Sequence, residues 1–232
     1  MSNFSVKSDS YDPWSAPHVG GLTPALFDYL KKWSFEDVNS ENPEVWNWLY
    51  RHILLTKPYI QPTGAKETVP WVPGHYGGAN RYGPIDTVDC EVMVIGKTPT
   101  REEVAEGRLG VDSGGKLLKE IFTAHDLDWS TTYFSNICRF PLPGLTKAIS
   151  AKWLKDCMPF LEKEIELVNP RVVVLNGAEA LKAFFPKGKL KESRGQLLRW
   201  NRVPMFATIS LGQVVRDPSF LEELSYDIGH VK

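Results

Sequence analysis

The stretch Glu91–Leu118, EVMVIGKTPTREEVAEGRLGVDSGGKLL, decides the fold of this chain. Its first five residues have the composition of a buried strand, and they run directly into Gly96. A loop with Pro99 and several glycines follows, and a helical pattern begins at Lys116. A strand that opens into a glycine-rich loop and then a helix is how α/β proteins build a site at the carboxyl end of a sheet. We therefore expect the functional site in this stretch.

The same alternation continues to the end of the chain. Apolar, strand-like runs occupy residues 92–95, 132–137, 172–175 and 203–208. Helix-like segments lie between and after them, at residues 115–124, 150–168, 178–185 and 218–226. Short, almost entirely apolar strands that alternate with helices are typical of a parallel sheet covered on both faces. We predict an α/β domain over residues 89–232, a three-layer α/β/α sandwich around a four-stranded, mainly parallel sheet.

Residues 1–88 are expected to form an N-terminal extension of helical and irregular structure. Amphipathic patterns predict helices at Leu22–Trp33 and Pro43–Thr56. The proline- and glycine-rich stretch 57–89 predicts a long irregular loop, and such loops are unusual unless they are functional or tied down. Four aromatic residues are available to tie it down or to contact a ligand: Trp71, His75, Tyr76 and Tyr82.

The bulk composition narrows the classes of protein. A net charge of -1 means that any binding of nucleic acid must come from a local patch. No run of eighteen apolar residues occurs, which predicts no membrane span, and the N-terminus lacks the layout of a signal peptide. Three scattered cysteines, Cys90, Cys138 and Cys157, are too few for a disulfide framework. We expect a cytoplasmic protein that is a monomer.

Several common catalytic motifs are excluded. Gly110–Leu117 superficially fits a phosphate-binding P-loop, but Leu117 stands where the motif needs a hydroxyl for magnesium. The sequence has no Cys-x-x-Cys pair, and its five histidines are dispersed, so no metal site is predicted. The Gly-x-Ser-x-Gly elbow of serine hydrolases is also missing.

Two features have both a structural and a functional interpretation. Asn136 ends an apolar strand, where its amide can serve as a cap or can read the Watson–Crick edge of a base held out of a duplex. Six cations within residues 187–202 form either a solvated turn or a surface that contacts the phosphate backbone. These cations are Lys187, Lys189, Lys191, Arg194, Arg199 and Arg202.

Taken in order, these pieces resemble the uracil-DNA glycosylase superfamily, nearest to its family-4-like branch, over residues 88–225. Gly96–Thr100 with Glu103 resembles the motif Gly-Glu-Ala-Pro-Gly-x-x-Glu, and Gly107–Leu118 resembles the segment that follows it. Tyr133–Asn136 resembles the strand that ends in the base-reading asparagine. Three further segments match the family's later elements: Asn169–Ala180, Ser193–Gly195 and Thr208–Arg216.

The chain departs from the family pattern at the positions that carry chemistry. Lys97 replaces a glutamate, and Gly110 replaces the aromatic residue that stacks on the extracted base. Ser210 stands where the family has a histidine that stabilises the departing base. Of the four iron–sulfur cysteines of family 4, only Cys157 clearly falls at a matching position. The resemblance therefore implies an enzyme without a cofactor, and no iron–sulfur cluster is expected.

The resemblance also implies roles for individual residues. Glu103, with Asp112 in reserve, would orient water and offset positive charge on the sugar, while Lys97 and Ser210 would stabilise the leaving base. The later matched segments would contact the DNA backbone. The base-binding residues implied are Gly96, Thr98, Pro99, Gly110 and Asn136. The DNA-backbone residues implied are Ser193, Arg194, Gly195 and Arg216.

We expect a DNA glycosylase that flips a non-standard base from DNA, single- or double-stranded, and hydrolyses its glycosidic bond. Replacing a stacking aromatic by Gly110 removes a side chain that buries roughly 150–250 Å². The space would admit a pyrimidine with a bulky C5 substituent, such as the hypermodified bases of phage DNA. Two alternatives remain open: a catalytically silent accessory of replication or of phage–host conflict, which binds DNA or protein, and a glycosylase of free nucleosides.

Overall fold

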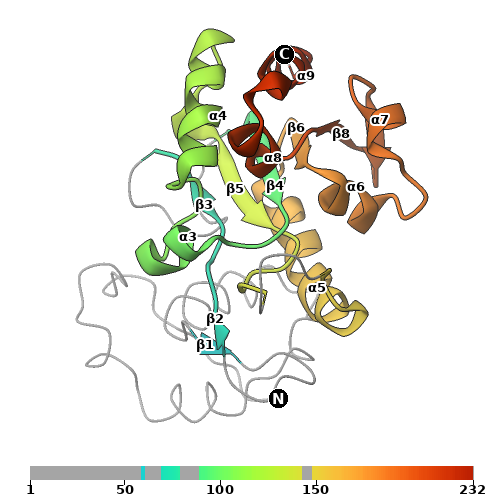
Figure 1. Cartoon of the computed structure of the whole chain (residues 1–232). Helices are drawn as coiled ribbons and strands as arrows, with labels where there is room; N and C mark the ends of the chain where they lie inside the picture. Colours follow the sequence, from blue (N-terminus) through green and yellow to red (C-terminus); the bar gives the residue numbers. More distant parts are fainter. Residues whose placement is uncertain (1–58, 61–68, 79–88, 143–147, 232) are drawn as a thin grey trace. The chain divides into compact units, whose positions relative to one another are not determined.

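A computed structural model describes residues 59–60, 69–78, 89–142 and 148–231, all within one compact unit of residues 57–232 (Figure 1). The helices predicted at 22–33 and 43–56 lie outside the described residues, as does Tyr82. The N-terminal extension as a separate domain therefore stays a prediction. Within the stretch 57–89, a small antiparallel pair forms from β1 (Tyr59–Ile60) and β2 (Val69–Pro70).

The main sheet has six strands in the order β3-β5-β4-β6-β8-β7. The four predicted strands are present and mutually parallel: β4 (Val92–Gly96), β5 (Tyr133–Asn136), β6 (Val172–Asn176) and β8 (Val203–Thr208). The predicted number of four was too low, because an antiparallel strand is added at each edge. These are β3 (His75–Tyr76) and β7 (Leu198–Trp200), which are too short to leave a periodic signal in the sequence.

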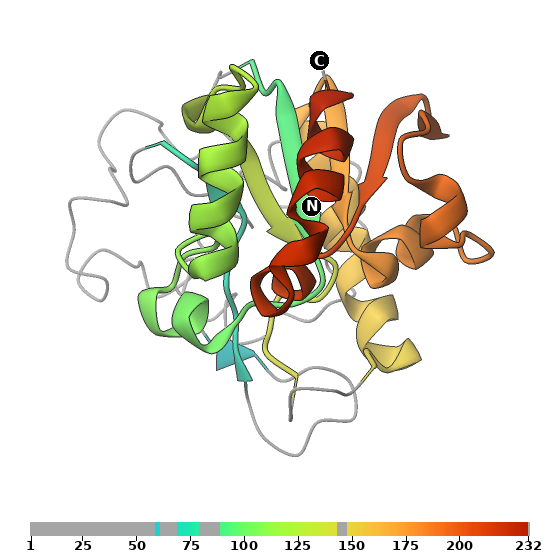
Figure 2. The same ribbon diagram turned by 45° about the horizontal axis from the view of Figure 1, so that its top comes forward.

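Helices cover both faces of the sheet, as the α/β/α prediction requires. On one face lie α4 (Ser113–Ala124), α8 (Leu211–Arg216) and α9 (Leu221–Gly229), and Figure 2 shows α4 and α9 side by side there. The opposite face packs against α5 (Ala151–Val168), α6 (Ala178–Phe184) and α7 (Leu190–Ser193). Two single-turn helices complete the layers, η3 (Trp129–Thr131) and η4 (Pro218–Phe220).

Burial on both faces explains why the parallel strands are apolar throughout. Val92 and Val94 of β4 pack toward α4 and α9, while the alternate residues Met93 and Ile95 pack toward α5 and α6. Neither set of side chains reaches water, so no polar position interrupts the strand.

The connections place a crevice at the carboxyl ends of the central strands. From β4 the chain passes to β5 on one side, and then it crosses to β6 on the other side. Open α/β sheets bind their ligands where the direction of winding reverses in this way. The loop after β4, with α3 (Arg101–Glu106), lies at this end of the sheet (Figure 1).

Candidate active site

Polar side chains line up where the parallel strands end. Asn136 pairs in register with Gly96, and Asn176 pairs with Thr208 on the next strands. A Cβ atom at Gly96 would clash with Oδ1 of Asn136 and would lie 3.8 Å from Nδ2 of Asn176. A side chain at position 96 would therefore displace the Asn136 amide, so glycine leaves this amide its place beside β4.

The strand that carries Asn136 is fixed from the opposite face by a buried carboxylate. Glu164 of α5 accepts hydrogen bonds from the Tyr133 hydroxyl at 2.6 Å and from the Ser135 hydroxyl at 2.7 Å. It also forms an ion pair with Arg139, and both side chains are fully buried. Because a buried charge is tolerated only with its partners in place, this network holds the end of β5 in one position.

The loop after β4 is built around Glu103. Thr100 caps α3, and the Glu103 carboxylate accepts the Thr100 backbone N–H at 2.8 Å, which completes a capping box. The other carboxylate oxygen accepts the N–H of Gly110 at 2.6 Å. Burial raises the pKa of Glu103, although these hydrogen bonds oppose the shift. Both oxygens of Glu103 thus bind backbone, and the side chain joins the two ends of the loop.

His75 holds the same loop from the edge of the sheet. Its Nε2 accepts the backbone N–H of Leu109 at 2.8 Å, so Nδ1 carries the proton and donates to the Tyr76 carbonyl at 2.8 Å. Burial lowers the pKa of His75 to about 4, so the ring is neutral at physiological pH. Residues 109 and 110 are therefore anchored twice, by His75 and by Glu103.

Two predicted site residues serve as helix caps and also face the crevice. Asp112 caps α4 by accepting the Gly115 N–H at 2.8 Å through Oδ1. Ser210 caps α8 by accepting the Gln213 N–H at 3.3 Å, which leaves its hydroxyl hydrogen able to donate. Both side chains are half-buried, and α8 is held further by Asn176, whose Oδ1 accepts the Leu211 N–H at 2.8 Å.

Lys97 forms an ion pair that the sequence did not suggest. Its Nζ donates to the Glu179 carboxylate at 2.8 Å, and the hydrogen bond from Lys97 lowers the pKa of Glu179. Both side chains are partly exposed, so the pair contributes little to stability. It does fix a cation and an anion at the rim of the crevice.

These residues surround one cavity of about 470 Å³, a size typical of small-molecule sites. Eight of the nine residues predicted for catalysis or base binding line it, together with Arg216; the exception is Pro99, which is buried. The predicted residues that line it are Gly96, Lys97, Thr98, Glu103, Gly110, Asp112, Asn136 and Ser210.

The predicted Ser193–Gly195 backbone loop lies apart from the cavity lining. Arg194 donates through Nε to Asp227 at 2.8 Å and forms an ion pair with Glu223. Asp227 is buried and also accepts the Thr208 hydroxyl at 2.8 Å. The guanidinium is therefore bound to two carboxylates of α9, while a contact with DNA at this loop stays a prediction.

The lining residues that the sequence did not single out include Asn176, Glu179 and Phe134. Asn176 carried a readable signal, because it ends an apolar strand in an amide just as Asn136 does. Phe134 lies two residues before Asn136 and thus on the same face of β5. Glu179 carried no signal, since its partner Lys97 is 82 residues away in the chain.

The described cysteines do not make a cluster site by themselves. Cys138 and Cys157 are fully buried and their thiols contact each other, whereas the Cys90 thiol donates to the Val92 carbonyl. An iron–sulfur cluster takes four thiolate ligands, and these residues bring two together. No group of three metal-binding side chains occurs among the described residues. The expectation of a cofactor-free protein stays a prediction.

No helix of the described segments is long and apolar enough to cross a membrane.

Comparison with known proteins gives the cavity its context. A family model described as the uracil DNA glycosylase superfamily matches residues 82–224. A type-4 uracil-DNA glycosylase of Thermotoga maritima is 29% identical over 131 residues, which cover 55% of this chain and 67% of the relative. The type-4 uracil-DNA glycosylase of Archaeoglobus fulgidus is 25% identical over 166 residues, or 66% of this chain and 81% of the relative.

A third relative is of another kind. A DNA polymerase of Bacillus phage SP01 is 22% identical over 143 residues, which cover 60% of this chain but 15% of the polymerase. The family match spans more than half of the chain and includes every lining residue of the cavity. The chain is a divergent, family-4-like member of the uracil-DNA glycosylase superfamily.

Proposed function

We propose that this protein is a DNA glycosylase that takes a flipped base into the 470 Å³ cavity and hydrolyses its glycosidic bond. The observation that carries the proposal is the position of Asn136, buried at the end of β5 and held against Gly96. An amide there offers one donor and one acceptor to the Watson–Crick edge of a pyrimidine. Phe134, in the same lining, supplies an aromatic wall.

Base loss requires a carboxylate near the anomeric carbon, because the sugar develops oxocarbenium character. Glu103 and Asp112 both line the cavity, but they differ in their hydrogen bonds. Both oxygens of Glu103 accept backbone N–H groups, whereas the cap of Asp112 uses Oδ1 alone. We assign water orientation to Asp112 and the shaping of the loop to Glu103.

In the proposed reaction, the bond between C1′ and the base breaks and its electron pair leaves with the base. Water adds to C1′ and gives its proton to solvent through the Asp112 carboxylate. The departing anion needs positive charge or hydrogen-bond donors nearby. Lys97 supplies charge that Glu179 partly offsets, and the hydroxyl of Ser210 supplies a donor.

The preferred substrate in this proposal is a pyrimidine with a bulky C5 substituent, such as those of phage DNA. Gly110 has a φ of +69° and no side chain, and a Cβ atom there would make only ordinary contacts with Trp129 and Phe134. The position therefore has room for a group the size of a Cβ atom, and that group would touch both rings. The loss of that ring also weakens stacking on plain uracil, by about 1–3 kcal/mol.

A panel of duplex and single-stranded DNAs tests the proposal. Each DNA carries one uracil, 5-hydroxymethyluracil or bulkier C5-substituted pyrimidine, and alkali-sensitive abasic sites are measured after incubation. We expect cleavage of C5-substituted DNA to exceed that of uracil DNA, and Asn136→Ala to remove it. Asn201→Gly, which changes an exposed asparagine with φ of +46° in a turn, is the matched control. Efficient cleavage of uracil DNA alone would overturn the C5 preference.

A second function is favoured by the polymerase similarity. A DNA-binding accessory of replication would use the same surface without excising a base, and the likeness to part of a phage DNA polymerase supports it. This function predicts a wild type that binds all DNAs of the panel and leaves no abasic sites in any of them.

A further inference from the structure

A second cavity, of about 350 Å³, adjoins the first. The two share Leu109, Gly110 and Gly115 in their walls, so they meet at the loop that His75 and Glu103 anchor. This second cavity is not used by the proposed reaction. Its other described walls come from β3, α4 and η3: His75, Gly77, Arg108, Val111, Lys116, Lys119 and Trp129.

The second cavity is positively charged. Arg108, Lys116 and Lys119 line it, and the described lining residues include no carboxylate. Arg108 is held in place by donating to the carbonyls of Gly77 and Gly78 at 3.2 and 3.1 Å. Lys119 lies over the Trp129 ring, 5.8 Å from its centroid, which orients the ammonium group. The three cations therefore give this cavity a positive lining that an anionic group can approach.

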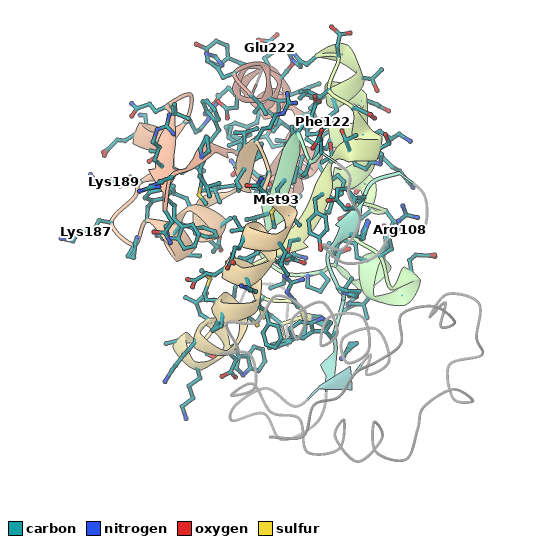
Figure 3. The ribbon with its side chains drawn as sticks, turned by 180° about the vertical axis from the view of Figure 1, so that it is seen from behind. Met93, Arg108, Phe122, Lys187, Lys189 and Glu222 are labelled. Carbon is teal, nitrogen blue, oxygen red and sulfur yellow. The ribbon has the colours of Figure 1, made fainter. Side chains whose placement is uncertain are left out.

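This charge is separate from the basic cluster at residues 187–202. Figure 3 shows Arg108 on the side of the sheet opposite to Lys187 and Lys189. The strand order agrees, since β3 and β7 are the two edges of the sheet. Arg108 binds the residues that follow β3, whereas Lys187 and Lys189 precede β7. A DNA duplex that contacts the cluster at residues 187–202 therefore need not contact the cations of the second cavity.

Gly110 is the boundary between the two cavities. A Cβ atom at Gly110 would lie 3.6 Å from Trp129, which lines the second cavity, and 3.7 Å from Phe134, which lines the first. The two rings pack against each other, with centroids 4.6 Å apart, so a Cβ atom at position 110 would touch both of them. Because residue 110 is glycine, this position beside the two rings holds no side chain, and a group attached to a base beside Phe134 can lie there, next to the second cavity.

We infer that the second cavity binds a negatively charged substituent at C5 of a pyrimidine whose ring occupies the first cavity. The inference rests on the proposed base-binding role of the first cavity and adds the charge of the substrate. Hydrogen bonds from cations to a carboxylate or phosphate are among the strong ones in proteins. A phosphate of the neighbouring nucleotide has the same chemistry, so the test must separate the two sources.

The test compares a carboxylate with a neutral group of the same shape. Duplex DNA carries one 5-carboxyuracil or one 5-carbamoyluracil, each on a 2′-fluorinated sugar that resists excision, and affinity is measured by fluorescence anisotropy. We expect the wild type to bind the carboxylate DNA about tenfold more tightly, the equivalent of one good charged contact. The double variant Lys116→Gln/Lys119→Gln should lose this preference. Lys155→Gln, an exposed lysine on α5, is the control that keeps it.

Each of the other possible results decides between the two sources of the anionic group or against the inference. Equal weakening of both DNAs by the double variant would assign the cations to a backbone phosphate and overturn the inference. A wild type without preference would overturn it too. If the charge preference appears but no DNA of the excision panel is cleaved, the binding inference stands and the glycosylase proposal fails.

A second variant tests the boundary independently of charge. Gly110→Asn keeps a residue that tolerates positive φ but places a side chain against Trp129 and Phe134. We expect it to weaken binding of both C5-substituted DNAs at least tenfold more than it weakens binding of uracil DNA. Unchanged binding of the substituted DNAs would show that the substituent does not pass Gly110.

Discussion

Charged residues gather at two places on this sheet, and they are used in opposite ways. At the carboxyl ends of β4–β6, Asp112, Lys97 and Arg216 border a cavity of about 470 Å³. Beside β8, Arg194 is bound to Asp227 and Glu223, and Asp227 in turn accepts the Thr208 hydroxyl. The first set of charges lines space that a ligand can fill, although Lys97 also pairs with Glu179, and the second set is paired within the protein.

These two groups show that the sequence alone does not reveal whether a charged side chain is free to bind a ligand or is already paired within the protein. An Arg-Gly loop and a lysine-rich turn suggested contact with the DNA backbone, yet Arg194 holds α9 on the sheet. The glycine-rich stretch looked like a generic phosphate loop, yet its polar side chains line a cavity of about 470 Å³. Substitutions in either group of charged residues test this contrast.

The largest effect is expected at Arg194. Arg194→Ala leaves the buried Asp227 carboxylate without its ion pair, so the free energy of unfolding should fall by about 4 kcal/mol. Chemical denaturation followed by circular dichroism measures it. Lys189→Ala, which removes an exposed cation paired with Glu192, is the control and should cost less than about 0.5 kcal/mol. Equal losses in the two variants would mean that Arg194 is not a structural brace.

Acid should lower the stability that the neutral His75 ring contributes by holding Leu109. His75 has a native pKa of about 4, while the unfolded chain binds this proton near pH 6.5. Its contribution to stability is therefore complete above pH 6.5 and decreases as the pH falls toward 4, by about 3 kcal/mol. Denaturation midpoints of wild type and His75→Gln across this range measure the difference. The variant should be less stable at pH 7 but less sensitive to acid, and parallel pH profiles would argue against a neutral buried ring.

Asp112 should matter for the reaction more than for the fold. Asp112→Asn keeps an oxygen for the Gly115 N–H, and asparagine caps helices as well as aspartate does. Excision under single-turnover conditions should slow about 100-fold, or about 2.7 kcal/mol, with an unchanged melting temperature. Glu103→Gln is the comparison variant. Relative to Asp112→Asn, it should lower the free energy of unfolding more and slow excision less. The reverse pattern would return the water-orienting role to Glu103.

The smallest effect is expected at the rim. Arg216 ends α8, is exposed and lines the cavity, so Arg216→Ala should weaken DNA binding a few-fold and flatten its salt dependence by about one charge. Titrations at several salt concentrations measure both quantities. Unaltered salt dependence would remove Arg216 from the DNA-contacting surface.

The sequence predicted the parts of the fold that repeat a local pattern. The buried runs Val92–Ile95 and Val172–Leu175 can be recognised as strands because every residue in them is apolar. Asn136 was found by the amide that ends its strand, and the same reasoning applied to β6 would have found Asn176. The sequence Thr100-x-x-Glu103 is a capping box that signals the start of α3, although it was taken for a loop.

What could not be predicted depends on contacts between distant residues. His75 reaches the pocket because the two-residue strand β3 pairs with β5, and no local pattern marks such a short strand. The pairing of Lys97 with Glu179 joins the loop after β4 to the first turn of α6. The binding of Arg194 to α9 likewise spans 33 residues, and it alone decides that this cation is satisfied internally.

The most direct test compares Asn136→Ala with Arg194→Ala in one single-turnover excision assay, on the best DNA of the panel, below the melting temperature of both variants. Asn136→Ala should form no abasic sites, although its melting temperature should match that of the wild type. Arg194→Ala should still excise the base although it is less stable. An active Asn136→Ala, or an Arg194→Ala that folds but no longer excises, would contradict the central claim that the chemistry lies at the carboxyl ends of β4–β6.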